Sequence, residues 1–262
     1  MNLQEALSLG SKGVISLVGA GGKTSLMYAL ARELVSSGRR VLTTTTTRIF
    51  MPEGDHFSAA IISDVAGEIT AQAEVLLKDH SHLTAGSAFL KDQNKLNGLK
   101  PAVIESILHS GLFDFIIIEA DGAARRPLKA CAPHEPVVPL FSDRIVALAG
   151  LDAVAKPLTG ELVFRSSIFS RVTGLAPMQE ITESSIASVM LHDMSAISDT
   201  GRASMRIAFL NKADNRERRQ AGERIAAIFE KEDRSIFHRI IIGTLKPTPT
   251  IYQCMEMEQE RT

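Results

Sequence analysis

The sequence predicts an α/β protein with a mostly parallel sheet and helices on both faces. Short apolar runs rich in β-branched residues alternate along the chain with segments of helical periodicity. A glycine-rich turn joins the first such run to the first helical segment. The chain has 262 residues, 45% of them hydrophobic and 23% charged, which is enough to bury a sizeable core. We therefore expect a single α/β domain over residues 1–262.

The first fifty residues predict a βαβ unit. Residues 13–18 form a β-branched apolar run that stops at glycines, as a buried parallel strand does. From Thr24 onward, leucines and a methionine recur at three- and four-residue spacing until Gly38 supplies a helix stop. Val41 then opens a second strand that runs into the threonines at 43–47. The crossover between these strands should be right-handed.

The rest of the chain continues this alternation, although its middle is harder to interpret. Residues 91–100 are polar, and we expect a loop there. Strands are predicted at 59–62, 83–86, 113–118, 145–149, 207–210 and 236–242, and helices at 65–79, 181–193 and 215–231.

Composition excludes several classes of protein. The chain carries 29 basic and 30 acidic side chains, no Trp and two Tyr, so it offers little charge or ring surface to nucleic acid. No apolar run approaches the roughly 18 residues of a membrane helix, and residues 1–13 do not resemble a secretory signal. A cytoplasmic protein is expected. Cys131 and Cys254 are too far apart in sequence to suggest a disulfide framework.

The strongest motif is a phosphate-binding turn between the first strand and the first helix. Glycines let backbone N–H groups approach a phosphate, and the helix start adds partial positive charge. Lys23 would reach the β- and γ-phosphates, and the Thr24 hydroxyl would bind Mg²⁺. Leu17 replaces the first glycine of the full G-x-x-x-x-G-K-[ST] pattern, which leaves the shorter G-x-x-G-K-T loop of Mur-type ligases. The alternative is a plain glycine turn with a surface lysine. The predicted nucleotide-binding residues here are Gly19, Gly21, Gly22, Lys23, Thr24 and Ser25.

Two carboxylates end the most strand-like segment. Glu119 and Asp121 alternate onto one face at its carboxyl end, the edge where open α/β sheets bind ligands. Mg²⁺ is a hard cation that prefers oxygen ligands, so Asp121 is predicted to hold the metal with Thr24. Glu119 is predicted to position a nucleophile, although it could instead form a structural ion pair.

The threonine run ends at the same sheet edge. Up to Thr45, a β-branched strand explains the sequence. Beyond it, Thr46, Thr47 and Arg48 are predicted to line a γ-phosphate or a second substrate, since a guanidinium matches phosphate and carboxylate oxygens. Ordinary strand residues are the equally weighted alternative.

Asn211, Lys212 and Asp214 form an N-K-x-D motif after a predicted strand. In GTP-binding proteins the aspartate of this motif accepts from the guanine N1–H and amine, and the lysine packs along the base. The motif favours GTP over ATP. The alternative is a strand-to-helix turn in which Asp214 or Asn215 caps the next helix.

Basic residues follow the acidic strand end. Arg125, Arg126 and Lys129 could take anionic substrate or transition-state charge, or they could cap a helix and remain solvated. Cys131 and His134 together are too few to make a metal site.

The chain resembles the YqeC family, which is described as accessory to selenium-dependent hydroxylases. The resemblance rests on residues 18–25, 41–48, 118–122, 126–129 and 134–136. It implies a P-loop NTPase-like fold and a role in maturing a selenium-dependent molybdenum hydroxylase. It also implies functional roles at Gly19, Gly22, Lys23, Thr24, Asp121 and Lys129, and less strongly at Arg126, His134 and Glu135.

Our leading hypothesis is an Mg²⁺-dependent nucleoside triphosphatase that uses GTP in preference to ATP. One alternative is an ATP-dependent ligase or kinase acting on a small acid or cofactor. Another is a binding module that a nucleotide switches with little hydrolysis. The predicted catalytic residues are Lys23, Thr46, Arg48, Glu119 and Lys129.

Overall fold

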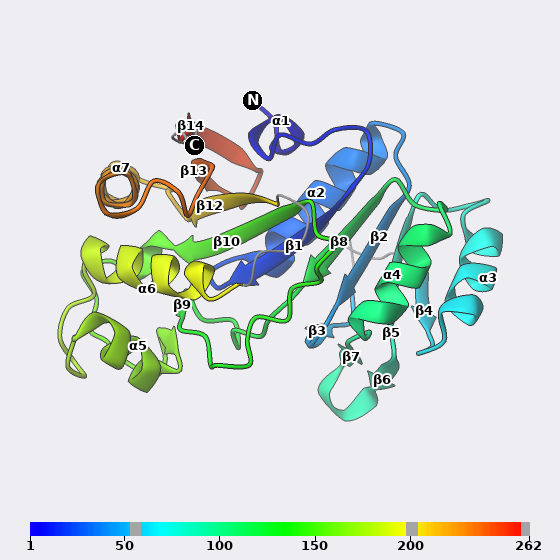
Figure 1. Ribbon diagram of the computed structural model, residues 1–262, viewed down its shortest axis with the longest axis horizontal. Coiled ribbons are helices and arrows are strands. Elements are labelled where there is room, and N and C mark those ends of the chain that lie inside the picture. Colours follow the sequence, from blue (N-terminus) through cyan, green and yellow to red (C-terminus); the bar gives the residue numbers. More distant parts are fainter. Residues whose placement is uncertain (53–58, 198–203, 258–262) are drawn as a thin grey trace.

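A nine-stranded sheet forms the framework of the computed structural model, which describes residues 1–52, 59–197 and 204–257. Its strands are β1 (Gly13–Gly19), β2 (Val41–Thr45), β4 (Ala59–Ile62), β5 (His82–Gly86), β8 (Phe115–Glu119), β10 (Arg144–Gly150), β12 (Met205–Asn211), β13 (Arg239–Thr244) and β14 (Thr250–Glu256). Their order is β14-β13-β12-β10-β1-β8-β2-β5-β4 (Figure 1). Only β13 and β14 pair antiparallel among these neighbours. The predicted mostly parallel sheet is confirmed.

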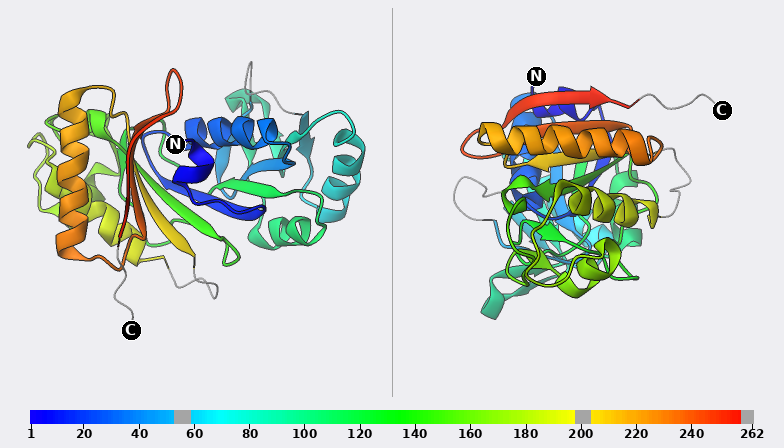
Figure 2. Two further views of the ribbon diagram at one scale, coloured as in Figure 1. Left: turned by 90° about the horizontal axis from the view of Figure 1, so that it is seen from above. Right: turned by 90° about the vertical axis from the view of Figure 1, so that its left-hand side faces the viewer.

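Helices cover both faces of this sheet. They are α1 (Leu3–Ala6), α2 (Lys23–Ser36), α3 (Ala66–Leu76), α4 (Pro101–His109), α5 (Ser166–Thr173), α6 (Glu183–Ser195) and α7 (Arg216–Glu232). Ile15 and Leu17 of β1 pack with α1 and α2, whereas Val14 and Val18 belong to the core formed with α3, α4, α6 and α7. Successive strand residues point to opposite faces, so a strand between two helical layers is apolar throughout. Figure 2 shows α2 and α7 on opposite sides of the sheet.

Within the described ranges, no helix combines the length and the apolar character needed to cross a membrane.

Two small sheets lie beyond the carboxyl ends of the large one. The first contains β3 (Arg48–Phe50), β7 (Lys95–Asn97) and β6 (Ala88–Leu90), with the 3₁₀ turn η2 (Lys91–Gln93) between β6 and β7. The second pairs β9 (Leu128–Lys129) with β11 (Val163–Phe164).

Two predictions are wrong in the first small sheet. Residues 91–100 are not simply a loop, because they contain η2 and β7. The second strand does not continue through the threonines at 46 and 47 to Arg48, because β2 stops at Thr45 and Arg48 begins β3. The physical reason is the burial of Ile49 and Leu96, which are 2% and 0% exposed and hold both short strands against the core.

Candidate functional site

The turn between β1 and α2 presents backbone N–H groups at a helix start. Gly21 has φ 77° and Gly22 has φ 146°. At either position an added Cβ would collide, with the Gly150 backbone at Gly21 and with Asn211 Nδ2 at Gly22. In the described part of the chain, the amides of residues 22–25 donate no hydrogen bond. They open a helix of 14 residues, and such free donors suit an anion.

Lys23 lies back over this turn and contacts the acidic strand end. Its Nζ donates to the Gly19 carbonyl at 2.5 Å and lies 2.8 Å from Asp121 Oδ1. The Glu119 carboxylate is 4.0 Å away, and the Lys23 side chain is only 3% exposed. The ammonium group is therefore engaged by Asp121, and an anion entering the turn would compete with that carboxylate for it.

Asp121 is fully buried and surrounded by donors. Its Oδ2 accepts from the Gly19 N–H at 2.9 Å and pairs with Lys129 Nζ at 2.9 Å, while Oδ1 faces Lys23. The ammonium groups of Lys23 and Lys129 and the Gly19 amide thus surround the Asp121 carboxylate. A metal ion bound by Asp121 would have to replace an ammonium group, so these contacts favour a counter-ion that holds the turn in place.

Glu119 is the carboxylate that contacts Thr24. The Thr24 hydroxyl donates to Glu119 Oε2 at 2.8 Å, and Glu119 is 7% exposed. Burial raises the pKa of the Glu119 carboxyl, although Lys23 and Thr24 oppose that shift. A hydroxyl and a carboxylate side by side offer oxygen ligands to a hard divalent cation.

Lys129 extends the charge network away from the turn. Its buried Nζ contacts Asp121, the Gly122 carbonyl at 2.9 Å and Glu135 Oε2 at 2.5 Å. Arg165 donates two hydrogen bonds, of 2.5 and 2.8 Å, to the Glu135 carboxylate. Burial raises the pKa of Glu135, but the bonds from Arg165 and Lys129 outweigh it and hold the pKa at about 2. Sequence reasoning missed Arg165, because no motif marks the residue before α5.

The end of β2 lies beside Glu119. The Thr46 N–H donates to the Glu119 carbonyl at 3.1 Å, and the Thr46 hydroxyl donates to the Val137 carbonyl at 3.1 Å. Arg48 is exposed, and its Nε donates to Asn97 Oδ1 at 3.3 Å within the small sheet. The structure therefore brings Thr46 to the acidic strand end but places Arg48 with the small sheet.

The turn after β12 is tied to the phosphate-binding turn. Asn211 is 3% exposed and donates through Nδ2 to the Gly21 carbonyl at 2.6 Å. Lys212, at φ 66°, pairs with Asp152 at 2.8 Å. Asn211 and Lys212, two of the three residues predicted to bind guanine, are thus held beside the turn by Gly21 and Asp152.

Asp214 completes the motif with a side chain that is 48% exposed. It accepts from the Thr244 hydroxyl at 2.5 Å and pairs with Arg218 at 2.9 Å. Asn215 caps α7 by accepting from the Arg218 N–H, so the helix-cap alternative applies to Asn215. Sequence reasoning missed Thr244, which lies two residues beyond the predicted strand at 236–242 and ends β13.

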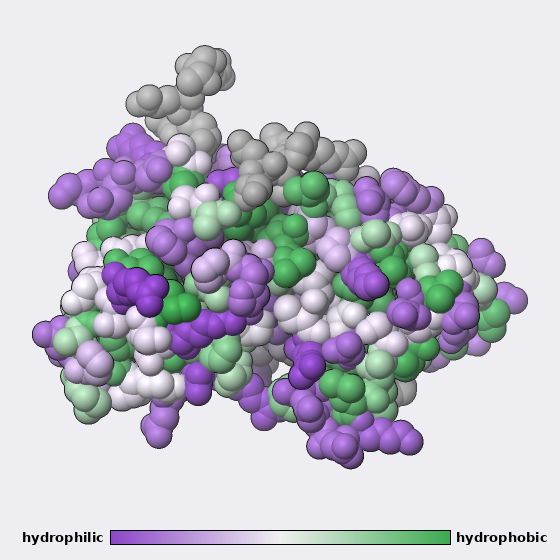
Figure 3. Space-filling model, turned by 60° about the horizontal axis from the view of Figure 1, so that its bottom comes forward, coloured by the Kyte–Doolittle hydropathy of each residue, from purple (hydrophilic) through white to green (hydrophobic). Residues whose placement is uncertain are grey.

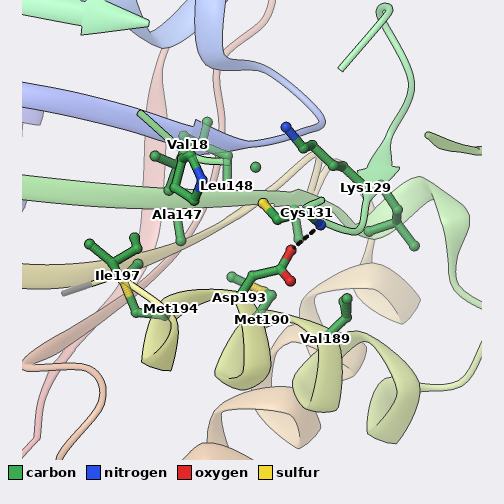
Figure 4. A pocket seen from close by; sticks show the side chains of 14 residues that line it. Val18, Lys129, Cys131, Ala147, Leu148, Val189, Met190, Asp193, Met194 and Ile197 are labelled. Atoms are coloured by element: carbon green, nitrogen blue, oxygen red, sulfur yellow. Dashed lines mark hydrogen bonds between the residues drawn. The ribbon is translucent and has the colours of Figure 1, made fainter. Parts of the chain in front are cut away.

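A small apolar cavity adjoins the turn on the side of Lys129 (Figure 4). Met190 and Met194 line it, and the Cys131 N–H donates to Asp193 Oδ2 at 2.8 Å. Burial raises the pKa of the Cys131 thiol, so the thiol stays protonated. Within the described ranges, no three His, Cys, Asp or Glu side chains cluster as a metal site.

The strand, glycine turn and helix at the centre of a mostly parallel sheet define a P-loop NTPase-like α/β protein. The chain belongs to the YqeC family. The family model described as YqeC protein matches residues 15–167. The "Uncharacterized protein YqeC" of Escherichia coli (strain K12) is 33% identical over 243 residues, which cover 91% of this chain and 90% of that protein. The crystal structure of FtsY from Mycoplasma mycoides matches with a TM-score of 0.40 and 14% identity, over 94% of this chain and 67% of that chain.

Proposed function

We propose that this protein binds and hydrolyses a nucleoside triphosphate with Mg²⁺. The observation that carries the proposal is the turn itself, where free amides at residues 22–25 and the Lys23 ammonium converge at a helix start. Positioning and charge stabilisation account for most catalysis of phosphoryl transfer, and this turn would supply both.

Thr24 and Glu119 fit Mg²⁺ because they place a hydroxyl and a carboxylate together at the turn. The bound ion would offset negative charge on the phosphates. Lys23 would leave Asp121 for the phosphate oxygens, and Lys129 would keep Asp121 paired. The carboxylate of Glu119 and the hydroxyl of Thr46 are the groups proposed to orient the attacking water.

GTP is the preferred nucleotide in this proposal. Support comes from the N-K-x-D turn, which is fixed against the phosphate-binding turn by Asn211. Asp214 is exposed, and its carboxylate is oriented by Thr244, which donates to Oδ1, and by Arg218, which donates to Oδ2. A carboxylate can accept two hydrogen bonds from guanine, whereas adenine has no such pair of donors.

The test compares nucleotide hydrolysis by the native protein, Lys23→Ala and the control Lys12→Ala. Lys12 is 66% exposed and pairs with Asp114 at 3.8 Å, so its loss removes a lysine without touching the turn. We expect Lys23→Ala to lose hydrolysis and Lys12→Ala to retain it, with faster turnover of GTP than of ATP. Equal hydrolysis by the native protein and Lys23→Ala would contradict the proposal.

Two other functions remain distinguishable by the same assay. Turnover that appears only when a small acid or cofactor is added would indicate a kinase or ligase. Tight nucleotide binding with negligible turnover under all conditions would indicate a nucleotide-switched binding module.

We also propose, from the family resemblance, that the nucleotide serves the maturation of a selenium-dependent molybdenum hydroxylase. Cells carrying only the Lys23→Ala protein should then contain that hydroxylase in normal amount but with reduced activity. Unchanged specific activity of the hydroxylase would contradict this role.

A further inference from the structure

The small sheet of β3, β7 and β6 has one face turned away from the core. Ile49 and Leu96 occupy the inner face and are buried. Residues alternate along strands, so the opposite side chains form an outer face. Figure 3, which turns the bottom of the molecule forward, shows a projecting part that is largely hydrophilic around a hydrophobic spot. We define the outer face by Arg48, Phe50, Leu90, Lys95 and Asn97.

Two cations meet the Phe50 ring at this face. The Arg125 guanidinium lies 3.9 Å from the ring centroid and Lys95 Nζ lies 5.1 Å from it. Phe50 is 37% exposed. Neither cation pairs with a carboxylate in the described part of the chain, and Asp92, the one acidic residue between 82 and 100, lies in η2 rather than on the face. A stacked guanidinium is held flat with its N–H groups free, which suits an oxyanion.

The loop that carries Arg125 is attached to the phosphate-binding turn. The Arg126 carbonyl, one residue further, accepts from the Gly21 N–H at 3.0 Å. Ala124 and Arg125 both have left-handed backbone, with φ 48° and 60°. Residues other than glycine rarely adopt this conformation, so surrounding contacts must hold the loop in it. The loop therefore links the outer face to the turn by a short, constrained path.

We propose that the outer face, together with Arg125, binds the phosphate or carboxylate group of a small second substrate beside the nucleotide. Three strands of three residues span roughly 10 Å in each direction, which fits a small molecule better than a folded partner. Arg125 and Lys95 supply the charge, and the Phe50 ring supplies apolar contact. The inference deepens the proposed function and rests on it, because it identifies the chemistry of the group that would lie near the terminal phosphate.

The experiment measures anion binding by thermal shift, with and without the non-hydrolysable β,γ-imido analogue of GTP and Mg²⁺. Inorganic phosphate and succinate are titrated separately, with chloride at equal ionic strength as the reference. Filling the turn with the analogue ensures that added phosphate reports on the second site. The variants are Arg125→Gln and Lys95→Gln, and the control is Arg171→Gln, an exposed arginine on α5.

We expect one of the two anions to raise the melting temperature of the native protein and of Arg171→Gln. The apparent affinity should fall about tenfold in Arg125→Gln and Lys95→Gln, the loss of one charged hydrogen bond. The anion that binds distinguishes a phosphoryl from a carboxylate substrate. An anion effect that does not exceed that of chloride, or one that is unchanged in Arg125→Gln, overturns the inference. Failure of the analogue itself to bind overturns the proposed function instead.

Discussion

Replacing Asp121 with asparagine should tighten the binding of a nucleoside triphosphate in the absence of Mg²⁺. The Asp121 carboxylate holds the Lys23 ammonium at 2.8 Å inside a buried network. A phosphate that enters the turn must draw Lys23 away from this carboxylate. An asparagine keeps one oxygen, which can accept from the Gly19 N–H, but its other terminal group is an NH2 donor that cannot hold the Lys23 ammonium.

The magnitude follows from the charged contact that Lys23 no longer has to give up. A contact with a charged group contributes about 1.5–3 kcal/mol. The lower end of that range corresponds to roughly tenfold in affinity. We therefore expect the dissociation constant of Mg²⁺-free GTP to fall about tenfold in Asp121→Asn.

The assay is isothermal titration with and without Mg²⁺, and the control is Asp193→Asn. Asp193 accepts from the Cys131 N–H at 2.8 Å, so this change neutralises a neighbouring aspartate without altering the partners of Lys23. Opening a buried ion pair costs roughly 3–5 kcal/mol of folding free energy. Far-UV circular dichroism must therefore show that each variant is folded at the temperature of the titration.

Lys129→Met should act in the opposite direction. Without Lys129, Asp121 keeps only the Lys23 ammonium, so nucleotide affinity should fall while Glu135 remains paired with Arg165. Both variants weaken the fold, so opposite changes in affinity cannot come from instability. The reasoning is refuted if Asp121→Asn weakens GTP binding, and most clearly if the loss is confined to titrations with Mg²⁺, as a metal ligand requires.

Three other substitutions test separate parts of the site. Gly22→Ala should reduce GTP affinity in the same titration, because its Cβ would collide with Asn211 Nδ2 and displace the turn; unchanged affinity would show that the turn tolerates the side chain. Asp214→Asn should weaken GTP about tenfold and leave ATP unchanged in competition assays, and an equal effect on both would contradict guanine recognition. The Glu135 carboxyl has its pKa lowered from 4.5 to about 2, so its stabilisation is complete above pH 4.5 and is lost as the pH falls towards 2. The free energy of unfolding of the native protein in urea should therefore fall by up to about 3 kcal/mol over that range relative to Glu135→Gln, whereas parallel losses would show that Arg165 and Lys129 do not lower the pKa of Glu135.

Long periodic segments could be predicted because their pattern reflects burial in the large sheet and its helices. The strands at 59–62 and 145–149 and the helix at 215–231 appear close to their expected positions. Short elements could not be predicted in this way, because they are stabilised by residues distant in sequence. β7 depends on Leu96 in the core, and α4 has only nine residues to display a helical period.

The candidate site could also be predicted only where its residues are contiguous in sequence. The turn at residues 19–24 is contiguous, so its glycines and Lys23 could be recognised from the sequence. The pairing of Thr24 with Glu119 depends on a side-chain reach that alternation along the strand does not determine. The contact between Glu135 and Arg165 joins two irregular segments, and no local pattern encodes their approach.

The hydrogen bond between Asn211 and the Gly21 carbonyl has a consequence for how this protein can be shortened. The family match ends at residue 167, so a fragment cut there would retain every glycine of the turn. It would nevertheless lose the Asn211 amide that donates to the Gly21 carbonyl, and it would lack β12, which pairs with β10. We therefore expect such a fragment to bind ligands at the turn more weakly than the whole chain does.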